Sequence, residues 1–315
     1  MVKRIYNILR LLRPRQWVKN FAIFAAVTFT GELFNPASVS PVILGFFIFC
    51  AISSASYIIN DIFDIKNDKM HPFKKFRPLA HGDISVPFAT MLAFFLIVFS
   101  ITLSTIISPT FFLFIIVYIL LQIFYSTLLK TITVIDILAI AAGYILRVLG
   151  GEIASGFHIS VWLLLTTISI SLFLAIGKRR SELTLLSASK VENISATRKT
   201  LSHYSERLLD VYASIFATST FISYALFTFL EDPKGINISF GGIVMPEYLG
   251  AFLNRKWLML TIIPVVYGLM RYLQDIYEKH EGESPERVLF SDKPLLATVT
   301  LWALLVIFII YFVGL

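Results

Sequence analysis

Nine apolar stretches recur along the chain, and each is long enough to cross a lipid bilayer as an α-helix, which takes about 20 residues. They cover approximately residues 16–34, 41–60, 86–107, 109–128, 133–151, 160–177, 209–230, 257–274 and 294–314. With 57% of the 315 residues hydrophobic and 15% charged, the composition excludes a soluble globular domain. We therefore expect an all-α, polytopic membrane protein with one intramembrane domain over residues 1–315.

Lysine and arginine are concentrated in alternate connections between these stretches. Of the 27 basic residues, 23 lie at the start of the chain or after the second, fourth, sixth and eighth stretches. Arg147 lies inside the fifth stretch, and the opposite connections hold Lys234, Arg255 and Lys256. The positive-inside rule therefore places the N-terminus and the basic connections in the cytoplasm and the C-terminus outside, in the inner (plasma) membrane. The net charge of +7 then matches anionic lipid and a phosphorylated substrate, not nucleic acid.

Three aspartates follow the second apolar stretch directly, where a spanning helix reaches water. If the helix continues, Asp61, Asp64 and Asp68 fall within roughly 60° of one another, because spacings of three, four and seven return to one face. Such a cluster repels itself unless a cation neutralises it, and Mg²⁺ prefers carboxylate oxygens together with substrate phosphates. Solvated polar residues at a helix end are the alternative interpretation. Three acids in register with Asn60 favour a metal–diphosphate site.

A basic segment comes next, and it supplies donors for phosphate oxygens. This segment contains Lys74 and Arg77. Further along, Lys130 follows the fourth stretch, and Lys178 and Arg179 end the sixth. Basic residues at a helix C-terminus are electrostatically ordinary, but here they face the acidic segment from the same side of the membrane. A substrate with several phosphates would use both segments.

Four polar residues lie inside apolar stretches, where an uncompensated ionisable group is costly. They are Lys19, Asn20, Asp136 and Arg147. Lys19 and Asn20 enter the first stretch, which suggests a binding role that faces the interior of the bundle. Asp136 and Arg147 are eleven residues apart, or three helical turns, so they share a face but cannot bond directly. Each needs another partner, and a structural interhelical pair is the alternative to a functional role.

A helix end of the form Asn-Asp-x-x-Asp-x-x-x-Asp in such a bundle resembles the UbiA superfamily of intramembrane prenyltransferases, and the resemblance extends over nearly the whole chain. Six further motifs resemble its decaprenyl-phosphate phosphoribosyltransferase branch: Arg13-Pro14-Arg15-Gln16-Trp17-Val18-Lys19-Asn20, His71-Pro72, Arg77-Pro78, Tyr125-Ser126-Thr127-Leu128-Leu129-Lys130, Gly177-Lys178-Arg179 and Ser284-Pro285-Glu286. The resemblance implies a nine-helix UbiA-like bundle with a central cavity that faces the cytoplasm. Prenyl-transferring members carry a second acidic motif after the sixth helix, whereas this chain has basic residues there with only Glu182.

The resemblance also implies a reaction and a site. The reaction is Mg²⁺-dependent transfer of 5-phosphoribose from phosphoribosyl diphosphate to a polyprenyl phosphate, with release of diphosphate. The implied catalytic residues are Asp61, Asp64 and Asp136, and the implied metal ligands are Asp61, Asp64 and Asp68. The implied substrate-binding residues are Lys19, Asn20, Asn60, Lys74, Arg77, Tyr125, Lys130, Arg147, Lys178 and Arg179.

Two other functions remain open. A prenyltransferase that attaches a polyprenyl chain from its diphosphate to an aromatic or other small acceptor would use the same aspartates. A transporter or lipid-phosphate carrier would use Asp136 and Arg147 as charges along its pathway. Against a carrier, the acidic cluster lies at one membrane face, away from the midplane. A homo-oligomer is compatible with the sequence, and contact with membrane lipids is expected.

Overall fold

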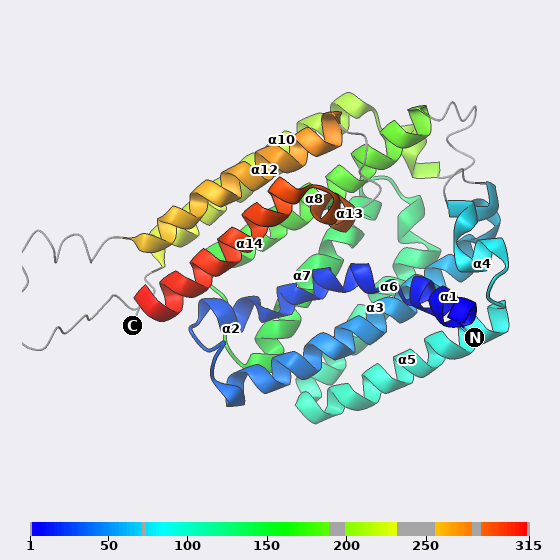
Figure 1. The fold of residues 1–315 in the computed structure, drawn as a ribbon, viewed down its shortest axis with the longest axis horizontal. Helices are drawn as coiled ribbons and strands as arrows, with labels where there is room; N and C mark the ends of the chain where they lie inside the picture. The colour runs from blue at the N-terminus through cyan, green and yellow to red at the C-terminus, as the bar shows by residue number, and fades with distance from the viewer. Residues whose placement is uncertain (1, 71–73, 189–198, 232–255, 279–284, 314–315) are drawn as a thin grey trace, which may run out of the picture.

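The structure, a computed structural model, describes residues 2–70, 74–188, 199–231, 256–278 and 285–313 (Figure 1). All regular secondary structure in these ranges is helical. Within them, eight helices are long and apolar enough to cross a membrane. The prediction of an all-α, polytopic membrane protein is therefore confirmed. Five residues considered above lie outside the described ranges: His71, Pro72, Lys234, Arg255 and Ser284.

The long helices correspond to eight of the nine expected stretches. They are α3 (Pro36–Met70), α5 (Val86–Ile107), α6 (Pro109–Thr127), α7 (Ile135–Ser155), α8 (Val161–Ala188), α10 (Glu206–Leu230), α12 (Ile262–Glu278) and α14 (Lys293–Phe308). Shorter helices connect or extend them: α1 (Val2–Leu12), η1 (Pro14–Phe24), α2 (Ala25–Phe29), η2 (Lys74–Phe76), α4 (Pro78–His81), η3 (Leu129–Thr131), η4 (Lys199–His203), η5 (Trp257–Thr261), α13 (Pro285–Ser291) and η6 (Ile309–Val313).

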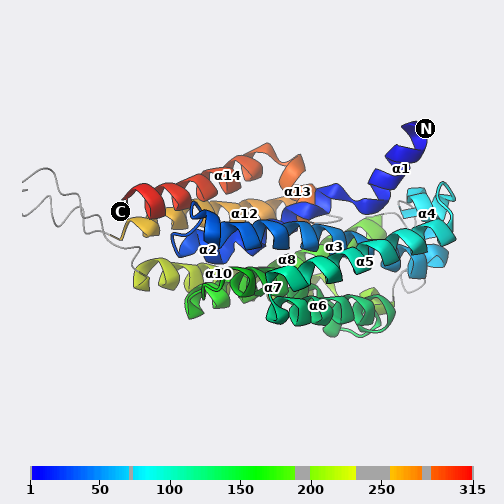
Figure 2. The same ribbon diagram turned by 90° about the horizontal axis from the view of Figure 1, so that it is seen from below.

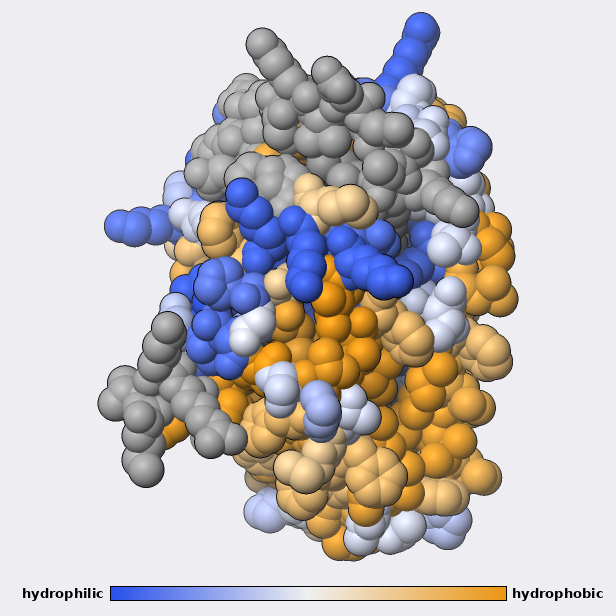
Figure 3. Space-filling model, turned by 90° about the vertical axis from the view of Figure 1, so that its right-hand side faces the viewer, coloured by the Kyte–Doolittle hydropathy of each residue, from blue (hydrophilic) through white to orange (hydrophobic). Residues whose placement is uncertain are grey.

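The long helices run along the long dimension of the molecule, as Figures 1 and 2 show from two directions. α3 packs against α5, and α8 packs against α7 and α10. α1 projects from one end of the bundle, beside α4. Seen from that end, hydrophilic residues form a band across a surface that is otherwise largely hydrophobic (Figure 3). This polar end carries the site described below.

Apolar side chains fill the interfaces between the helices. One cluster joins α8, α10 and α12 and includes Phe173, Leu209 and Ile276. Another joins α3 to α6 through Phe49 and Phe111, whose rings meet edge to face. In lipid, close packing and interhelical hydrogen bonds hold such interfaces, because the lipid tails are as apolar as the side chains.

The first expected stretch, residues 16–34, begins as a 3₁₀ helix instead of an α-helix. This helix, η1, has 11 residues and starts at Pro14, directly after Arg13, whose backbone is left-handed with φ 55°. Its close approach to α7 depends on Gly151, because a Cβ added there would lie 1.8 Å from the carbonyl oxygen of Ile23. A 3₁₀ helix places residues three apart directly above one another. That alignment decides which side chains of η1 reach the site.

Candidate active site

The acidic segment forms the last turns of α3, so its aspartates lie on a helix, as the spacing predicted. Asp61 is the most enclosed of the three, with 2% of its surface exposed. Both of its carboxylate oxygens accept from Nη2 of Arg13, at 2.5 and 2.7 Å. Oδ1 also accepts from Nη1 of Arg77, at 3.0 Å. One buried carboxylate is therefore held by two guanidinium groups.

Asp68 shares Arg77 with Asp61. Nη1 of Arg77 lies 2.8 Å from Oδ2 of Asp68 and 3.0 Å from Oδ1 of Asp61. A single cationic nitrogen thus lies between two carboxylates of α3. The two acids converge closely enough to share one cation.

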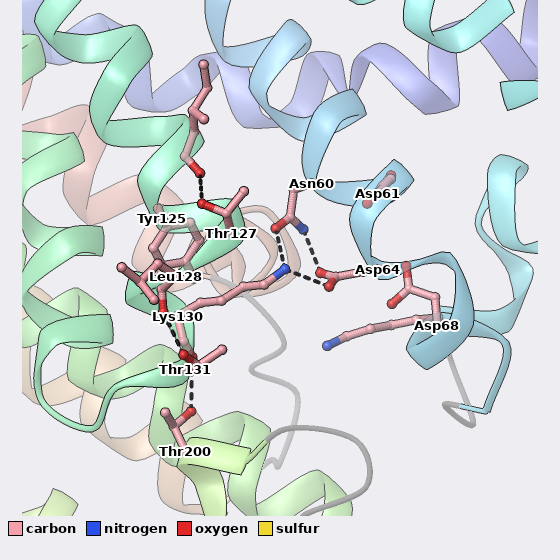
Figure 4. Close-up of polar contacts among 12 residues, drawn as sticks. Asn60, Asp61, Asp64, Asp68, Tyr125, Thr127, Leu128, Lys130, Thr131 and Thr200 are labelled. Carbon is pink, nitrogen blue, oxygen red and sulfur yellow. Dashed lines mark hydrogen bonds and ion pairs between the residues drawn. The ribbon is translucent and has the colours of Figure 1, made fainter. Parts of the chain in front are cut away.

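Asp64 faces a different cation (Figure 4). Nζ of Lys130, in η3, donates to Oδ1 of Asp64 at 2.6 Å and to Oδ1 of Asn60 at 3.3 Å. The Asn60 amide donates in turn to Oδ2 of Asp64, at 3.0 Å. The Asp64 side chain keeps 21% of its surface exposed, so a ligand can reach it. Asn60, Asp64 and Lys130 therefore form one polar group at the end of α3.

A second charged cluster surrounds Arg179 of α8, whose side chain is fully buried. Its Nε forms an ion pair with Oδ2 of Asp136 at 2.8 Å, and its Nη1 donates to Oε2 of Glu182 at 2.6 Å. Nη2 donates to the hydroxyl of Tyr125 at 3.1 Å. The Tyr204 hydroxyl donates to the other oxygen of Asp136, at 2.7 Å. Partners from several elements hold Arg179 in place.

Tyr204 keeps its proton at neutral pH. Burial and the hydrogen bond to Asp136 raise the pKa of this phenol well above its ordinary value. The hydroxyl therefore donates to Asp136 while it accepts from the backbone N–H of Val134 at 2.7 Å. These two hydrogen bonds fix the Tyr204 hydroxyl, which in turn orients the Asp136 carboxylate that holds Arg179.

The two lysines near this cluster differ in their partners. Nζ of Lys74 pairs with Oε1 of Glu182 at 2.8 Å, which ties the basic segment after α3 to α8. Lys178 is half-buried, and among the described residues no hydrogen bond or ion pair reaches its ammonium group. An ammonium group in these surroundings is available to an anionic ligand.

Three polar side chains at intervals of three residues form what we call the polar row. They are Arg13, which directly precedes η1, and Gln16 and Lys19 within η1, where the period of the 3₁₀ helix aligns the two. Nζ of Lys19 donates to Oε1 of Gln16 at 2.6 Å and pairs with Oε2 of Glu286, in α13, at 2.8 Å. The Gln16 amide donates to the other oxygen of Glu286. Because Arg13 binds Asp61, the polar row connects the aspartates of α3 to α13.

Arg147 and Asn20 form a third group. Nε of Arg147 donates to Oδ1 of Asn20 at 2.7 Å, Nη2 donates to the Tyr118 hydroxyl at 2.7 Å, and Nη1 donates to the carbonyl of Gly143. No carboxylate in the described part of the chain pairs with this guanidinium. The expectation that Asp136 and Arg147 find separate partners is thus confirmed.

The UbiA prenyltransferase family matches residues 21–291. The chain belongs to this family. A relative from Corynebacterium glutamicum, named decaprenyl-phosphate phosphoribosyltransferase, is 32% identical over 97% of this chain and 87% of its own length. A relative of the same name from Mycolicibacterium smegmatis is 30% identical over 95% of this chain and 90% of its own length. The resemblance to the UbiA superfamily is therefore confirmed, and the protein is an enzyme of this kind.

Solved structures share the fold of this UbiA enzyme. A UbiA homolog from Archaeoglobus fulgidus bound to GPP and Mg²⁺ aligns with a TM-score of 0.68 over 96% of this chain and 99% of its own, at 20% identity. The same archaeal homolog has been solved with DMAPP and Mg²⁺, with a TM-score of 0.67 at 19% identity over 96% of this chain and 98% of its own. These likenesses establish the fold.

The end of α3 in this UbiA enzyme has the ligand chemistry of a hard divalent cation. In the described ranges, no three acidic, histidine or cysteine side chains are gathered closely enough to bind a metal by themselves. Mg²⁺, however, is usually bound through one or two carboxylates, with water and substrate phosphates completing its shell. Arg77 already shows that Asp61 and Asp68 can share one cation. The residues present fit a divalent cation that binds together with a phosphorylated substrate.

Some site residues of the UbiA enzyme were not predicted from the sequence. Glu286 was quoted only within a motif and was assigned no role, yet it is 4% exposed and binds the polar row. Arg13 was quoted within a motif, but its contact with Asp61 was not foreseen. The three-residue spacing of Gln16 and Lys19 is no decisive signal, because residues three apart are neighbours on an α-helix as well as on a 3₁₀ helix. Tyr204 gave no signal at all.

Proposed function

We propose that this UbiA enzyme transfers 5-phosphoribose from phosphoribosyl diphosphate to a polyprenyl phosphate of the decaprenyl type and releases diphosphate. The relatives with that name support the proposal, since the similarity extends over 97% and 95% of this chain. The requirement for Mg²⁺ is part of the same proposal. It is supported by the Mg²⁺ in the archaeal structures and by the carboxylates at the end of α3.

The observation that carries the proposal is the basic end of α8. The resemblance seen in the sequence implies a second acidic motif at this place in prenyl-transferring members. Here the acid, Glu182, is already bound by Arg179 and Lys74. Lys178 beside it has no partner among the described residues. A donor with an additional 5-phosphate, or an acceptor that is itself a lipid phosphate, supplies the anion that this lysine lacks.

In the proposed reaction, the bond between the ribosyl C1 and a diphosphate oxygen breaks, and diphosphate leaves with the electron pair. An oxygen of the lipid phosphate then forms the new bond to C1 from the opposite face of the oxocarbenium-like sugar. When bound, Mg²⁺ supplies charge stabilisation for the leaving diphosphate, and Asp61, Asp64 and Asp68 with Asn60 would hold it. Because the lipid phosphate is already ionised, the reaction needs no strong general base.

The cations at the end of α3 bind phosphate in this scheme. Lys130 and Arg77 are ion-paired with carboxylates in the structure, and charged donors of this kind bind phosphate oxygens equally well. Lys74 joins them from η2. Asp136 is fully buried against Arg179, so we assign it a positioning role in which it fixes Arg179 and does not touch the sugar.

The polyprenyl chain would lie among the apolar side chains at the surface of the bundle. The hollow between α3, α5 and α6, lined by Ile59, Ile97 and Ile123 together with Ser56 and Gln122, has room for about one water molecule. It is therefore too small to hold the chain by itself.

The same proposal sets the orientation of the molecule. The ends of α3 and α8 would face the cytoplasm of the inner membrane, where phosphoribosyl diphosphate is soluble, and the C-terminus would lie outside. The distribution of lysine and arginine supports this arrangement.

Prenyl transfer to a small acceptor is the second candidate, and the GPP and DMAPP bound to the archaeal homolog favour it. The test uses full-length protein in detergent with Mg²⁺, polyprenyl phosphate and phosphoribosyl diphosphate labelled in the ribose. We expect label in the organic phase, and no such label when EDTA is present. Folded protein that leaves the label in water but consumes a prenyl diphosphate in the presence of an aromatic acceptor would contradict the proposal. A carrier would form no new bond in either reaction.

A further inference from the structure

Glu286 is a buried carboxylate that the proposed reaction does not use. It belongs to the first turn of α13, in the connection between α12 and α14, and 4% of its surface is exposed. Its two oxygens contact Gln16 and Lys19, which lie 270 and 267 positions earlier in the chain. A buried carboxylate is stable only when charged or hydrogen-bonded partners compensate it. The polar row of η1 supplies both kinds of partner.

The polar row has Glu286 at one end and Asp61 at the other. Lys19 donates to Gln16 at 2.6 Å, and Gln16 accepts from the Tyr57 hydroxyl at 3.2 Å. At the other end of the polar row, Arg13 binds Asp61. Since the 3₁₀ helix holds Gln16 and Lys19 on one line, a single carboxylate can fix both side chains.

The surroundings of Lys19 explain why a carboxylate is needed there. Lys19 lies over the ring of Tyr144, 5.6 Å from its centroid, and its side chain is only 13% exposed. Glu286 compensates the charge of this enclosed ammonium group. An ammonium group has three N–H donors. Glu286 and Gln16 occupy two positions around Lys19, which leaves one donor for a phosphate oxygen.

We propose that Glu286 is a positioning residue that acts through Lys19, holding this ammonium group where it binds a substrate phosphate. The inference rests on the proposed function, with Lys19 as one of the substrate-binding residues expected from the sequence. It adds α13, far from the aspartates in sequence, to the residues that determine phosphate binding.

A double-mutant cycle tests whether Glu286 acts through Lys19. The variants are Glu286→Gln, Lys19→Met and the double variant. Each is assayed as full-length protein for kcat and for the KM of the diphosphate donor. We expect Glu286→Gln to raise KM about tenfold with kcat changed by less than about threefold, because it removes the group that orients a binding residue. The double variant should match Lys19→Met. Effects that multiply in the double variant would overturn the inference, because Glu286 would then act independently of Lys19.

Two further variants separate positioning from simple loss of folding. Glu286→Asp keeps the charge and should recover part of the affinity that Glu286→Gln loses; equal KM values for the two would contradict a role for the charge. Glu206→Gln is the matched control, because Glu206 pairs at 3.1 Å with Arg180 while 47% of its own side chain is exposed, and its KM should equal that of the wild type. A control variant as impaired as Glu286→Gln would also overturn the inference.

The wild type is assayed in parallel with phosphoribosyl diphosphate and with a prenyl diphosphate, so that failure of the proposed function is recognised separately. If only the prenyl diphosphate reacts, the cycle is measured on that reaction. If neither reacts, it is measured on the apparent Kd for inorganic diphosphate with Mg²⁺, from the rise in Tm. In each case, coupling between Glu286 and Lys19 supports the inference and its absence refutes it.

Discussion

The replacement of Asp61 or Asp64 by asparagine is expected to give two variants with the same loss of activity and different stabilities. Both substitutions remove a carboxylate proposed to hold Mg²⁺, and both keep the shape of the side chain. The surroundings of the two acids differ. Asp61 is bound by two arginines and is 2% exposed, whereas Asp64 pairs with Lys130 and keeps 21% of its side chain exposed.

The expected loss of stability follows from these contacts. A buried charge left without its partner costs 3–5 kcal/mol in general, and partial exposure of Arg13 and Arg77, at 22% and 24%, reduces this. We expect about 3 kcal/mol for Asp61→Asn. A partly exposed lysine pair contributes at most about 1 kcal/mol, which we expect for Asp64→Asn. At about 2 °C per kcal/mol for a chain of this size, Tm should fall by about 6 °C and about 2 °C.

The assay is thermal unfolding in detergent, followed by tryptophan fluorescence, with turnover measured on the same preparations. Turnover should fall at least about 100-fold in both variants, because each removes a group that stabilises the transition state. Equal decreases in Tm would refute the assignment of Asp61 to a buried arginine pair. Normal turnover of Asp64→Asn with unchanged Mg²⁺ dependence would remove that aspartate from the mechanism.

Two other predictions concern α8 and α7. Lys178→Met should raise KM about tenfold and leave Tm unchanged. Arg179→Met should instead lower Tm by several degrees, because Arg179 is fully buried with three partners. A lower Tm for Lys178→Met would show that this lysine is paired. Gly151→Ala should sharply reduce the yield of folded protein, because its Cβ would meet the Ile23 carbonyl. Gly268→Ala, with open space around it, is the control. A normal yield of Gly151→Ala would contradict the close packing of η1.

The sequence predicts the long helices and the acidic face well, because both depend on local patterns. Apolar stretches of spanning length need no knowledge of neighbours, and the helical period alone aligns Asp61, Asp64 and Asp68. The pairing of Lys130 with Asp64 across 66 residues needs the helix packing. The sequence could therefore name Lys130 as a site residue but could not assign its partner.

The parts that the sequence misses depend on helix type and on distant contacts. An apolar stretch with Trp17 and Asn20 looks the same whether it forms an α-helix or η1, and only the 3₁₀ period aligns the polar row. Glu286 looks like a residue of a solvated connector because its partners lie at the other end of the chain. Arg179 was predicted to bind substrate, but its enclosure by Asp136, Glu182 and Tyr125 is visible only in the fold.

The most direct measurement of the central claim uses phosphoribosyl diphosphate with two labels, one in the ribose and one in the β-phosphate. Purified protein is supplied with this donor, polyprenyl phosphate and Mg²⁺, and both labels are counted over time. We predict that one ribose label enters the lipid for each labelled diphosphate released into water, and that EDTA stops both. Release of diphosphate without ribose in the lipid would indicate hydrolysis, and label in neither product from folded protein would contradict phosphoribosyl transfer.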